Sequence, residues 1–343
     1  GLSSAAAILY SGTSLTIVAT NIYSGISKFL LLAIPFFVLS GNIMAKAGIS
    51  TRLIRFVDTC VGHRKGGIAN VCIIVACFFG AISGSGPATV AALGAVLIPA
   101  MVERGGFSAP FSTALMATAS SIAIVIPPSI AFVVYASITG VSIGDMFMAG
   151  IVPGILMGLA LIVVVMLEVR KNHVVPSNVQ IASAKERLDA FKDAFWGFLM
   201  PVIILGGIYG GIFTPTEAAA VSVVYGLFVG MVIYKEVKLK DLWDILIDSA
   251  KTTGGIMLIV ACASLFSFVC TRFGISTAAS ELLAKVAGNQ FTFLLICNVI
   301  FLIAGCFIDA NSAMYIFIPI MLPVCKQLGY NVIAFGIMAT VNL

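Results

Sequence analysis

The chain has 343 residues, of which 60% are hydrophobic and 10% are charged, and its mean hydropathy is +1.14. Soluble domains are about 45–50% apolar and about 25% charged, so this chain has too few charges to cover a surface that faces water. The composition therefore excludes soluble, disordered and small disulfide-stapled classes. The net charge of +5 comes from basic residues spread over short segments between apolar runs, which does not favour binding to nucleic acid.

Long apolar runs dominate the chain, and a helix that crosses a bilayer needs about 20 such residues. Six runs of this kind cover residues 2–20, 27–47, 144–168, 194–213, 218–234 and 252–271. The segment 239–250 alternates charged and apolar residues at helical spacing, and we predict that it lies along the inner membrane surface. The pattern predicts an all-α polytopic membrane protein. Because the chain begins without methionine and ends inside an apolar run, we expect a longer protein.

Four further apolar segments, 66–104, 108–140, 290–327 and 330–343, are interrupted by Gly, Ser, Pro, Asn or Asp. At membrane depth such interruptions are tolerated only where the backbone is buried in protein or lines a wet cavity. We therefore predict a re-entrant helical hairpin over 66–104 and another over 290–327. We also predict that the helix over 108–140 is broken by prolines.

An internal repeat organises these segments. The tetrapeptide that begins at Gly48 recurs at Gly274, 226 residues later, and further glycines and prolines keep nearly the same spacing. The segment after the first copy carries four Lys or Arg residues, whereas its counterpart 276–290 carries Lys285 alone. This asymmetry, with an odd number of predicted crossings between the copies, predicts two inverted-topology repeats.

The predicted organisation has five parts. Residues 1–65 form the scaffold helices and arm of the first repeat, and residues 66–140 form its transport unit. Residues 141–193 supply a crossing helix and a cytoplasmic loop. Residues 194–289 supply a connecting span with the scaffold helices and arm of the second repeat, and residues 290–343 begin the second transport unit.

The tip of the first hairpin is a cluster of small and hydroxyl residues, from Gly80 to Thr89. Glycines let the backbone turn and expose carbonyls, while Ser83, Ser85 and Thr89 add hydroxyl oxygens. Unwound carbonyls at a midplane break coordinate small cations, and half-helix N-termini attract anions. The alternative is that these small residues only allow close helix packing.

Two adjacent prolines, Pro127 and Pro128, lie at the centre of the segment 108–140. They remove two backbone donors and break a helix. We expect the carbonyls that they free, together with the Ser129 hydroxyl, to face the first tip and complete a cage for a cation.

The second tip, from Gly305 to Ser312, contains Asp309. With the spans and hairpins predicted above, Asp309 is the only acidic residue expected deep in the membrane. An ionisable group there costs about 2.5–3.5 kcal/mol on insertion scales and needs a partner, such as a cation, a proton or a hydrogen-bond donor. The alternative is that Asp309 caps the following half-helix, which is compatible with cation binding.

A fourth motif runs from Gly206 to Glu217, where Thr214 and Glu217 form a predicted capping box with Pro215 in the first turn. We interpret this motif as structural.

These motifs together resemble a known family. The Gly-Ser-Gly-Ser tip, the Ile-Pro-Pro-Ser break that begins at Ile126, the TPTEAAA segment from Thr214 and the DANSAM tip from Asp309 are similar to the large membrane subunit of tripartite ATP-independent periplasmic (TRAP) transporters. The resemblance covers essentially all 343 residues. It implies an elevator-type importer of the bacterial inner membrane, a member of the ion transporter superfamily. The expected activity is sodium-coupled uptake of a carboxylate, such as a C4-dicarboxylate or sialic acid, with no organic cofactor and no catalysis.

The resemblance also implies partners and sites. The expected partners are a small membrane subunit, a periplasmic substrate-binding protein and the lipid bilayer. The residues expected to bind sodium are Ser83, Gly84, Ser85, Pro127, Ser129, Gly305, Asp309 and Asn311. The residues expected to bind the substrate are Ser83, Ser85, Thr89, Ser129, Asn311 and Ser312. The second proline break is expected shortly past Leu343.

Other functions fit parts of the pattern. A related sodium/dicarboxylate transporter or antiporter is the closest rival. An intramembrane serine protease with Ser83 or Ser85 as nucleophile would need a base, yet His63 and His173 both lie in polar segments outside the predicted spans. A passive channel is the third alternative, although paired proline breaks at a closed midplane make a poor pore.

Overall fold

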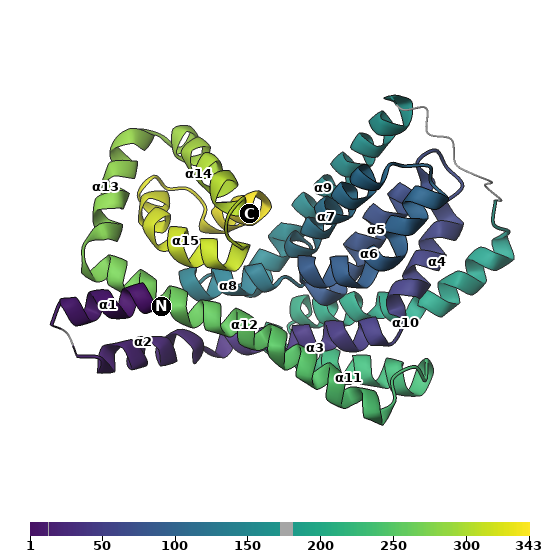
Figure 1. Ribbon diagram of the computed structural model, residues 1–343, viewed down its shortest axis with the longest axis horizontal. Helices are drawn as coiled ribbons and strands as arrows, with labels where there is room; N and C mark the ends of the chain where they lie inside the picture. Colours follow the sequence, from purple (N-terminus) through teal and green to yellow (C-terminus); the bar gives the residue numbers. More distant parts are fainter. Residues whose placement is uncertain (13, 172–180) are drawn as a thin grey trace. The chain divides into compact units, whose positions relative to one another are not determined.

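The computed structural model describes residues 1–12, 14–171 and 181–343, and the regular structure within these residues is helical. His173 lies outside the described residues. The helices, labelled in Figure 1, are α1 (Leu2–Tyr10), α2 (Thr16–Ile26), the 3-10 helix η1 (Phe29–Leu32), α3 (Ala33–Lys46), α4 (Ile49–Val61), α5 (Gly67–Ser83), α6 (Gly86–Glu103), α7 (Ala109–Val125), α8 (Ile130–Thr139), α9 (Ile143–Lys171), α10 (Ala184–Tyr209), α11 (Pro215–Phe228), the π-helix η2 (Val229–Ile233), α12 (Leu239–Arg272), α13 (Ile275–Ala287), α14 (Gln290–Gly305), α15 (Ala310–Gln327) and α16 (Val332–Asn342).

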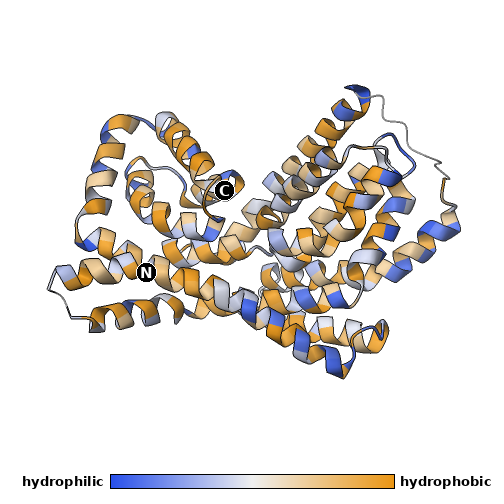
Figure 2. Cartoon of the chain, in the orientation of Figure 1, coloured by the Kyte–Doolittle hydropathy of each residue, from blue (hydrophilic) through white to orange (hydrophobic). Residues whose placement is uncertain are grey.

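Among the described residues, six helical segments are long and apolar enough to cross a membrane, and the interrupted pair α7 and α8 can supply a seventh. Their apolar residues run along the helices, while polar residues gather at turns and helix ends (Figure 2). The predicted all-α polytopic class is confirmed.

The predicted span over residues 2–20 is wrong. The structure has two helices there, α1 with 9 residues and α2 with 11, and each is too short to cross a bilayer. Gly12 between them has a φ of +68°, a left-handed conformation that favours glycine. The Ser11 hydroxyl donates to the Ile8 carbonyl at 2.7 Å, which satisfies an acceptor at the end of α1.

The predicted surface segment 239–250 is not a separate helix, because α12 continues through it to Arg272 without a break. Its amphipathic character is present, since Ile245 is buried and Trp243 is exposed. No proline lies between Leu239 and Arg272, and the pair Gly254 and Gly255 weakens a helix without ending it.

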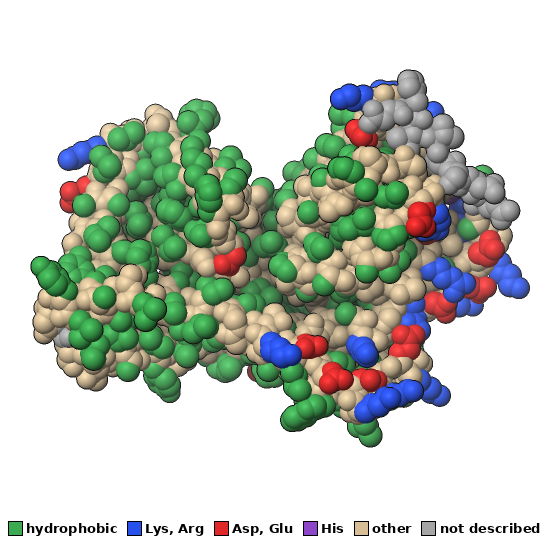
Figure 3. All heavy atoms as spheres, in the orientation of Figure 1, with side chains coloured by type: hydrophobic (Ala, Val, Ile, Leu, Met, Phe, Trp, Pro, Cys, Tyr) green, Lys and Arg blue, Asp and Glu red, His purple; other side chains and the backbone are tan. Residues whose placement is uncertain are grey.

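The chain divides into two compact units, and each is described by itself. Unit 2 comprises Pro35–Ile130 and Gly150–Ser249. Within it α5, α6 and α7 pack on one another, α4 packs between α5 and α10, and α10 also contacts α11. Charged side chains gather in clusters on this unit, whereas hydrophobic side chains cover much of the rest of the face in view (Figure 3). The charged residues include Arg52, Arg55 and Asp58 of α4 and Asp241, Asp244 and Asp248 of α12.

Unit 1 comprises Gly1–Ile34, Ala131–Ala149 and Ala250–Leu343. Here α13 packs on α14 and α15, and α14, α15 and α16 contact one another. Lys28 lies before η1 and its ammonium donates to the Ser137 carbonyl at 2.6 Å. That carbonyl belongs to the last turn of α8, where a positive charge is favourable.

The same order of helices occurs twice. Helices α4 to α7 have 13, 17, 18 and 17 residues, and α13 to α16 have 13, 16, 18 and 11. Both series start after a left-handed glycine, Gly48 with φ +69° and Gly274 with φ +73°. This order agrees with the predicted repeat. The inverted orientation of the copies and the five-part domain boundaries stay predictions.

Candidate functional site

The first tip is the turn that joins α5 to α6. Helix α5 ends at Ser83, Gly84 adopts φ +62°, and Ser85 is extended before α6 begins at Gly86. A Cβ on Gly84 would lie 2.6 Å from the Pro128 carbonyl oxygen. Gly84 therefore serves both the left-handed turn and the close approach of the tip to the proline break.

Three oxygen atoms meet inside this tip. The hydroxyl oxygens of Ser83 and Thr89 are 3.2 Å apart, and the Ser83 Oγ is 3.4 Å from the Ser85 carbonyl oxygen. The Thr89 hydroxyl donates to that same carbonyl at 2.9 Å. Ser83 and Thr89 are buried. The tip thus holds two hydroxyls and a carbonyl within reach of one small ion.

The proline break lies against this tip. Helix α7 ends at Val125, α8 starts at Ile130, and the Ile130 N–H donates to the Gly84 carbonyl at 3.4 Å. Because prolines lack an N–H, Pro128 leaves the Ile124 carbonyl without its helical donor. The Ser129 hydroxyl, which is buried, donates to that carbonyl instead.

The chemistry of this site is that of neutral oxygens. Among the described residues no group of three or more His, Cys, Asp or Glu side chains could hold a metal ion. Hydroxyl and carbonyl oxygens are hard ligands that suit hard cations rather than zinc or copper. The donor set at the first tip therefore fits an alkali cation.

The second tip joins α14 to α15, and Asp309 is its N-cap. The Asp309 carboxylate accepts from the backbone N–H groups of Asn311 at 2.9 Å and Ser312 at 3.2 Å, and from the Ser312 hydroxyl. The capping alternative for Asp309 is thus seen in the structure. These three donors account for the capping role of Asp309, and its expected role as a sodium ligand stays a prediction.

Asn311 differs from its neighbours in this tip. Its side-chain oxygen Oδ1 is buried and has no hydrogen-bond partner. A buried acceptor without a donor costs about 1–3 kcal/mol. Gly305, at the end of α14, packs on the end of α16, because a Cβ there would lie 3.3 Å from the Asn342 carbonyl oxygen.

The structure therefore brings the predicted site residues together in two groups. Unit 2 holds Ser83, Gly84, Ser85, Thr89, Pro127 and Ser129, and unit 1 holds Gly305, Asp309, Asn311 and Ser312. Their assignment to sodium or to substrate stays a prediction.

Sequence reasoning missed Gly41 in α3. A Cβ on Gly41 would lie 3.2 Å from the Ser83 Cα, so this glycine lets α3 approach the first tip. The available signal was the small and polar run Ser40, Gly41 and Asn42 inside an otherwise apolar span.

Comparison with known proteins identifies the family. The family described as "Tripartite ATP-independent periplasmic transporter, DctM component" matches residues 1–343. The C4-dicarboxylate TRAP transporter large permease protein DctM of Pseudomonas aeruginosa is 41% identical over 344 residues, which cover 100% of this chain and 80% of that protein. The chain belongs to the DctM family of TRAP transporter permeases.

Other DctM relatives carry different substrate names. The 2,3-diketo-L-gulonate TRAP transporter large permease protein YiaN of Escherichia coli is 36% identical over 326 residues, covering 95% of this chain and 76% of that protein. The isethionate TRAP transporter permease protein DctMQ of Oleidesulfovibrio alaskensis is 40% identical over 344 residues, covering 100% of this chain and 54% of that protein.

Family membership settles several expectations. The chain is a multi-pass inner-membrane transporter subunit and not an enzyme, which excludes the serine protease. A TRAP permease acts with a periplasmic binding protein and usually a small membrane subunit.

Proposed function

We propose that this DctM-family chain imports a small organic carboxylate together with sodium ions. The observation that carries the proposal is the contact between the first tip and the proline break. There the Ser83 and Thr89 hydroxyls, the Ser85 carbonyl and the Gly84–Pro128 backbone approach form an oxygen-rich junction without an ionised side chain.

Sodium would bind at this junction first. In the described conformation the oxygens of Ser83, Ser85 and Thr89 hydrogen-bond one another. A cation would accept lone pairs from all three, and the hydroxyl protons would turn to other acceptors. Because the tip and the break supply oxygens from separate helices, a bound ion would hold them together.

The substrate carboxylate would then meet helix N-termini and neutral donors. Helix α6 begins at Gly86 beside Ser85, and α15 begins at Ala310 beside Asn311 and Ser312. Half-helix N-termini attract anionic groups, and hydroxyl or amide donors orient a carboxylate. The relatives named for a C4-dicarboxylate and for 2,3-diketo-L-gulonate are named for carboxylates, which supports this substrate class. The isethionate relative is named for a sulfonate, another small organic anion.

Delivery and movement complete the proposal. A periplasmic binding protein would present the anion, the small membrane subunit would stabilise the scaffold, and the tips with their broken helices would move past the scaffold in an elevator cycle.

The test is uptake by proteoliposomes that contain the complete transporter with its small subunit and its binding protein. An inward sodium gradient is expected to drive accumulation of a labelled C4-dicarboxylate, and an equal potassium gradient is expected to give none. Equal accumulation in potassium without sodium would contradict the ion assignment. Accumulation that does not require the binding protein would contradict the delivery route.

A further inference from the structure

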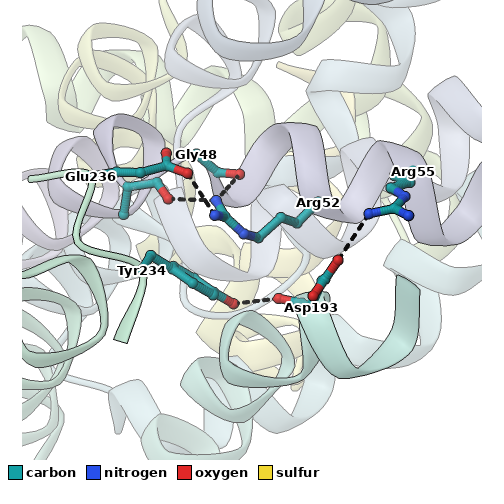
Figure 4. A network of polar contacts seen from close by, with 7 residues as sticks. Gly48, Arg52, Arg55, Asp193, Tyr234 and Glu236 are labelled. Atoms are coloured by element: carbon teal, nitrogen blue, oxygen red, sulfur yellow. Dashed lines mark hydrogen bonds and ion pairs between the residues drawn. The ribbon is translucent and has the colours of Figure 1, made fainter. Parts of the chain in front are cut away.

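A pocket of about 420 Å³ lies in unit 2, and no residue of either tip lines it. Figure 4 shows most of its polar lining, which comes from α4, from α10 and from the loop after η2. The residues that line it are Gly48, Thr51, Arg52, Arg55, Asp193, Ile233, Tyr234 and Glu236. Neither the sodium site nor the substrate site uses this pocket.

The pocket lies where three membrane helices change from apolar to charged. Helix α3 ends at Lys46, just before Gly48, and η2 ends at Ile233, just before Tyr234. On α10, Asp193 comes shortly before Phe195 and Trp196, and aromatic residues of this kind settle at membrane–water interfaces. This change from apolar to charged residues beside aromatic ones is typical of the level of lipid headgroups.

On one wall of the pocket the Arg52 guanidinium is already engaged by protein groups. The Arg52 guanidinium donates to the carbonyls of Ala47 at 3.0 Å and Gly48 at 3.1 Å, pairs with Glu236, and lies 3.9 Å from the ring centroid of Tyr234. Burial raises the pKa of the Tyr234 hydroxyl to about 12, so it stays protonated and donates to the Asp193 carbonyl at 2.6 Å. The Arg52 guanidinium therefore offers few free donors, while the Glu236 carboxylate of the same wall is 42% exposed.

On the other wall, Arg55 has N–H donors left to bind a ligand. The Arg55 side chain is 59% exposed and donates to Asp193 Oδ2 at 2.9 Å. A guanidinium has five N–H donors in a fork that matches a phosphate. Thr51 lies four residues earlier on α4, on the same helix face, and is exposed. Arg55 and Thr51 can therefore hold a phosphate together.

The charges select the kind of ligand. Two arginines and two carboxylates line the pocket, so its formal charge is zero. The carboxylates of Asp193 and Glu236 are 50% and 42% exposed, and they would repel a simple anion while accepting N–H donors. A group with a phosphate and an ammonium a few bonds apart satisfies both signs of charge, whereas a quaternary ammonium has no N–H to donate.

We propose that this pocket binds the phosphoethanolamine headgroup of a membrane phospholipid, with the phosphate on Arg55 and Thr51 and the ammonium on Asp193 and Glu236. A bound lipid would fill the corner between α4, α10 and the loop after η2. The headgroup could come from the bilayer or, with the same chemistry, from soluble phosphoethanolamine.

The test measures the melting temperature of the purified full chain in detergent with four additives. These are phosphatidylethanolamine, phosphatidylcholine and phosphatidylglycerol with identical acyl chains, and soluble O-phosphoethanolamine. Phosphatidylethanolamine is expected to raise the melting temperature more than the other two lipids. Arg55→Gln is expected to abolish that difference, and Arg170→Gln, an exposed charge at the end of α9, is expected to keep it.

Each other outcome overturns the proposal. An equal rise with all three lipids would show that only the acyl chains matter, and a larger rise with phosphatidylglycerol would show an anion site. If soluble phosphoethanolamine gave the whole effect, the assignment to a lipid would fail. If Arg55→Gln itself unfolds the protein, Thr51→Val is the variant to measure, because it leaves both ion pairs in place. It must still reduce the rise in melting temperature that phosphatidylethanolamine gives.

Discussion

Gly84 joins the turn of the first tip to the proline break, and its replacement tests that junction. In Gly84→Ala the left-handed backbone costs about 1–2 kcal/mol, and the new methyl would lie 2.6 Å from the Pro128 carbonyl oxygen. We expect sodium-driven uptake to fall at least tenfold. The measurement is initial uptake in proteoliposomes at equal protein density.

Gly206→Ala is the matched control for this substitution. Gly206 lies inside α10, and a Cβ there would meet nothing within 4 Å. Uptake by this variant is expected to equal that of the unmodified chain. Similar losses in both variants would show that the chain tolerates no added methyl, and the special role of Gly84 would be refuted.

The Ser83 hydroxyl is tested as a sodium ligand by the variant Ser83→Ala. Ser83→Ala removes one of the three oxygens that meet in the tip, and a hydrogen-bond-strength contact to a charged group is worth about 1.5–3 kcal/mol. We expect the sodium concentration that gives half-maximal uptake to rise by roughly tenfold or more.

Ser121→Ala supplies the comparison, since its hydroxyl donates locally to the Thr118 carbonyl on an exposed face of α7. Its sodium dependence is expected to stay unchanged. If Ser83→Ala lowered the maximal rate without changing the sodium dependence, Ser83 would act in folding or movement and not as a ligand.

The left-handed glycines that precede the two helix series, Gly48 and Gly274, have different surroundings. At Gly48 a Cβ would lie 2.2 Å from a Glu236 carboxylate oxygen and 2.7 Å from Arg52 Nη1, whereas at Gly274 nothing lies within 4 Å. The Arg52–Glu236 pair packs against Gly48, in the turn between α3 and α4. Among the described residues, no atom would contact a Cβ on Gly274, in the turn between α12 and α13.

These different surroundings predict that replacing Gly48 or Gly274 by alanine lowers the melting temperature by different amounts. Gly48→Ala and Gly274→Ala carry the same left-handed backbone penalty, so the difference between them reports the clash with Glu236 and Arg52. We expect Gly48→Ala to lower the melting temperature clearly more, and Glu236→Ala to relieve part of that loss in the double variant. Equal losses would mean that Glu236 moves aside at no cost.

Local signals explain what the sequence could predict about these elements. The capping box of Thr214 and Glu217 is confirmed, with the Glu217 N–H 3.3 Å from Thr214 Oγ1 and the Thr214 N–H donating to Glu217 Oε2 at 2.8 Å. The break at Pro127 and Pro128 is also where it was predicted, because missing donors act within one helical turn.

Features that depend on distant contacts could not be predicted in this way. Arg52 and Glu236 are 184 positions apart, and no periodicity links them. The predicted span over residues 2–20 was wrong for a different reason. The high mean hydropathy of this run was given more weight than the local turn signal at Gly12. Whether α12 would be one helix or two was undecided by composition, since two glycines permit either result.

The whole molecule is defined by membership of the DctM family, by its membrane-spanning helices and by two series of four helices in the same order. The proposed mechanism adds that the two series enter the membrane from opposite sides. In that proposed arrangement the tip at Ser83 and the tip at Asp309 would approach the substrate from opposite sides of the membrane. With the arm at Arg55 on the inner side, the predicted crossings would put 15 of the 19 Lys and Arg residues on that side, as the positive-inside rule favours.

The orientation of the two arms tests this claim most directly. Arg55→Cys and Lys285→Cys are made one at a time in a background without native cysteines, and intact cells that express the complete transporter are treated with a membrane-impermeant maleimide. We predict labelling of Lys285→Cys in intact cells, and labelling of Arg55→Cys only after the inner membrane is permeabilised. Labelling of both positions from the same side would contradict it.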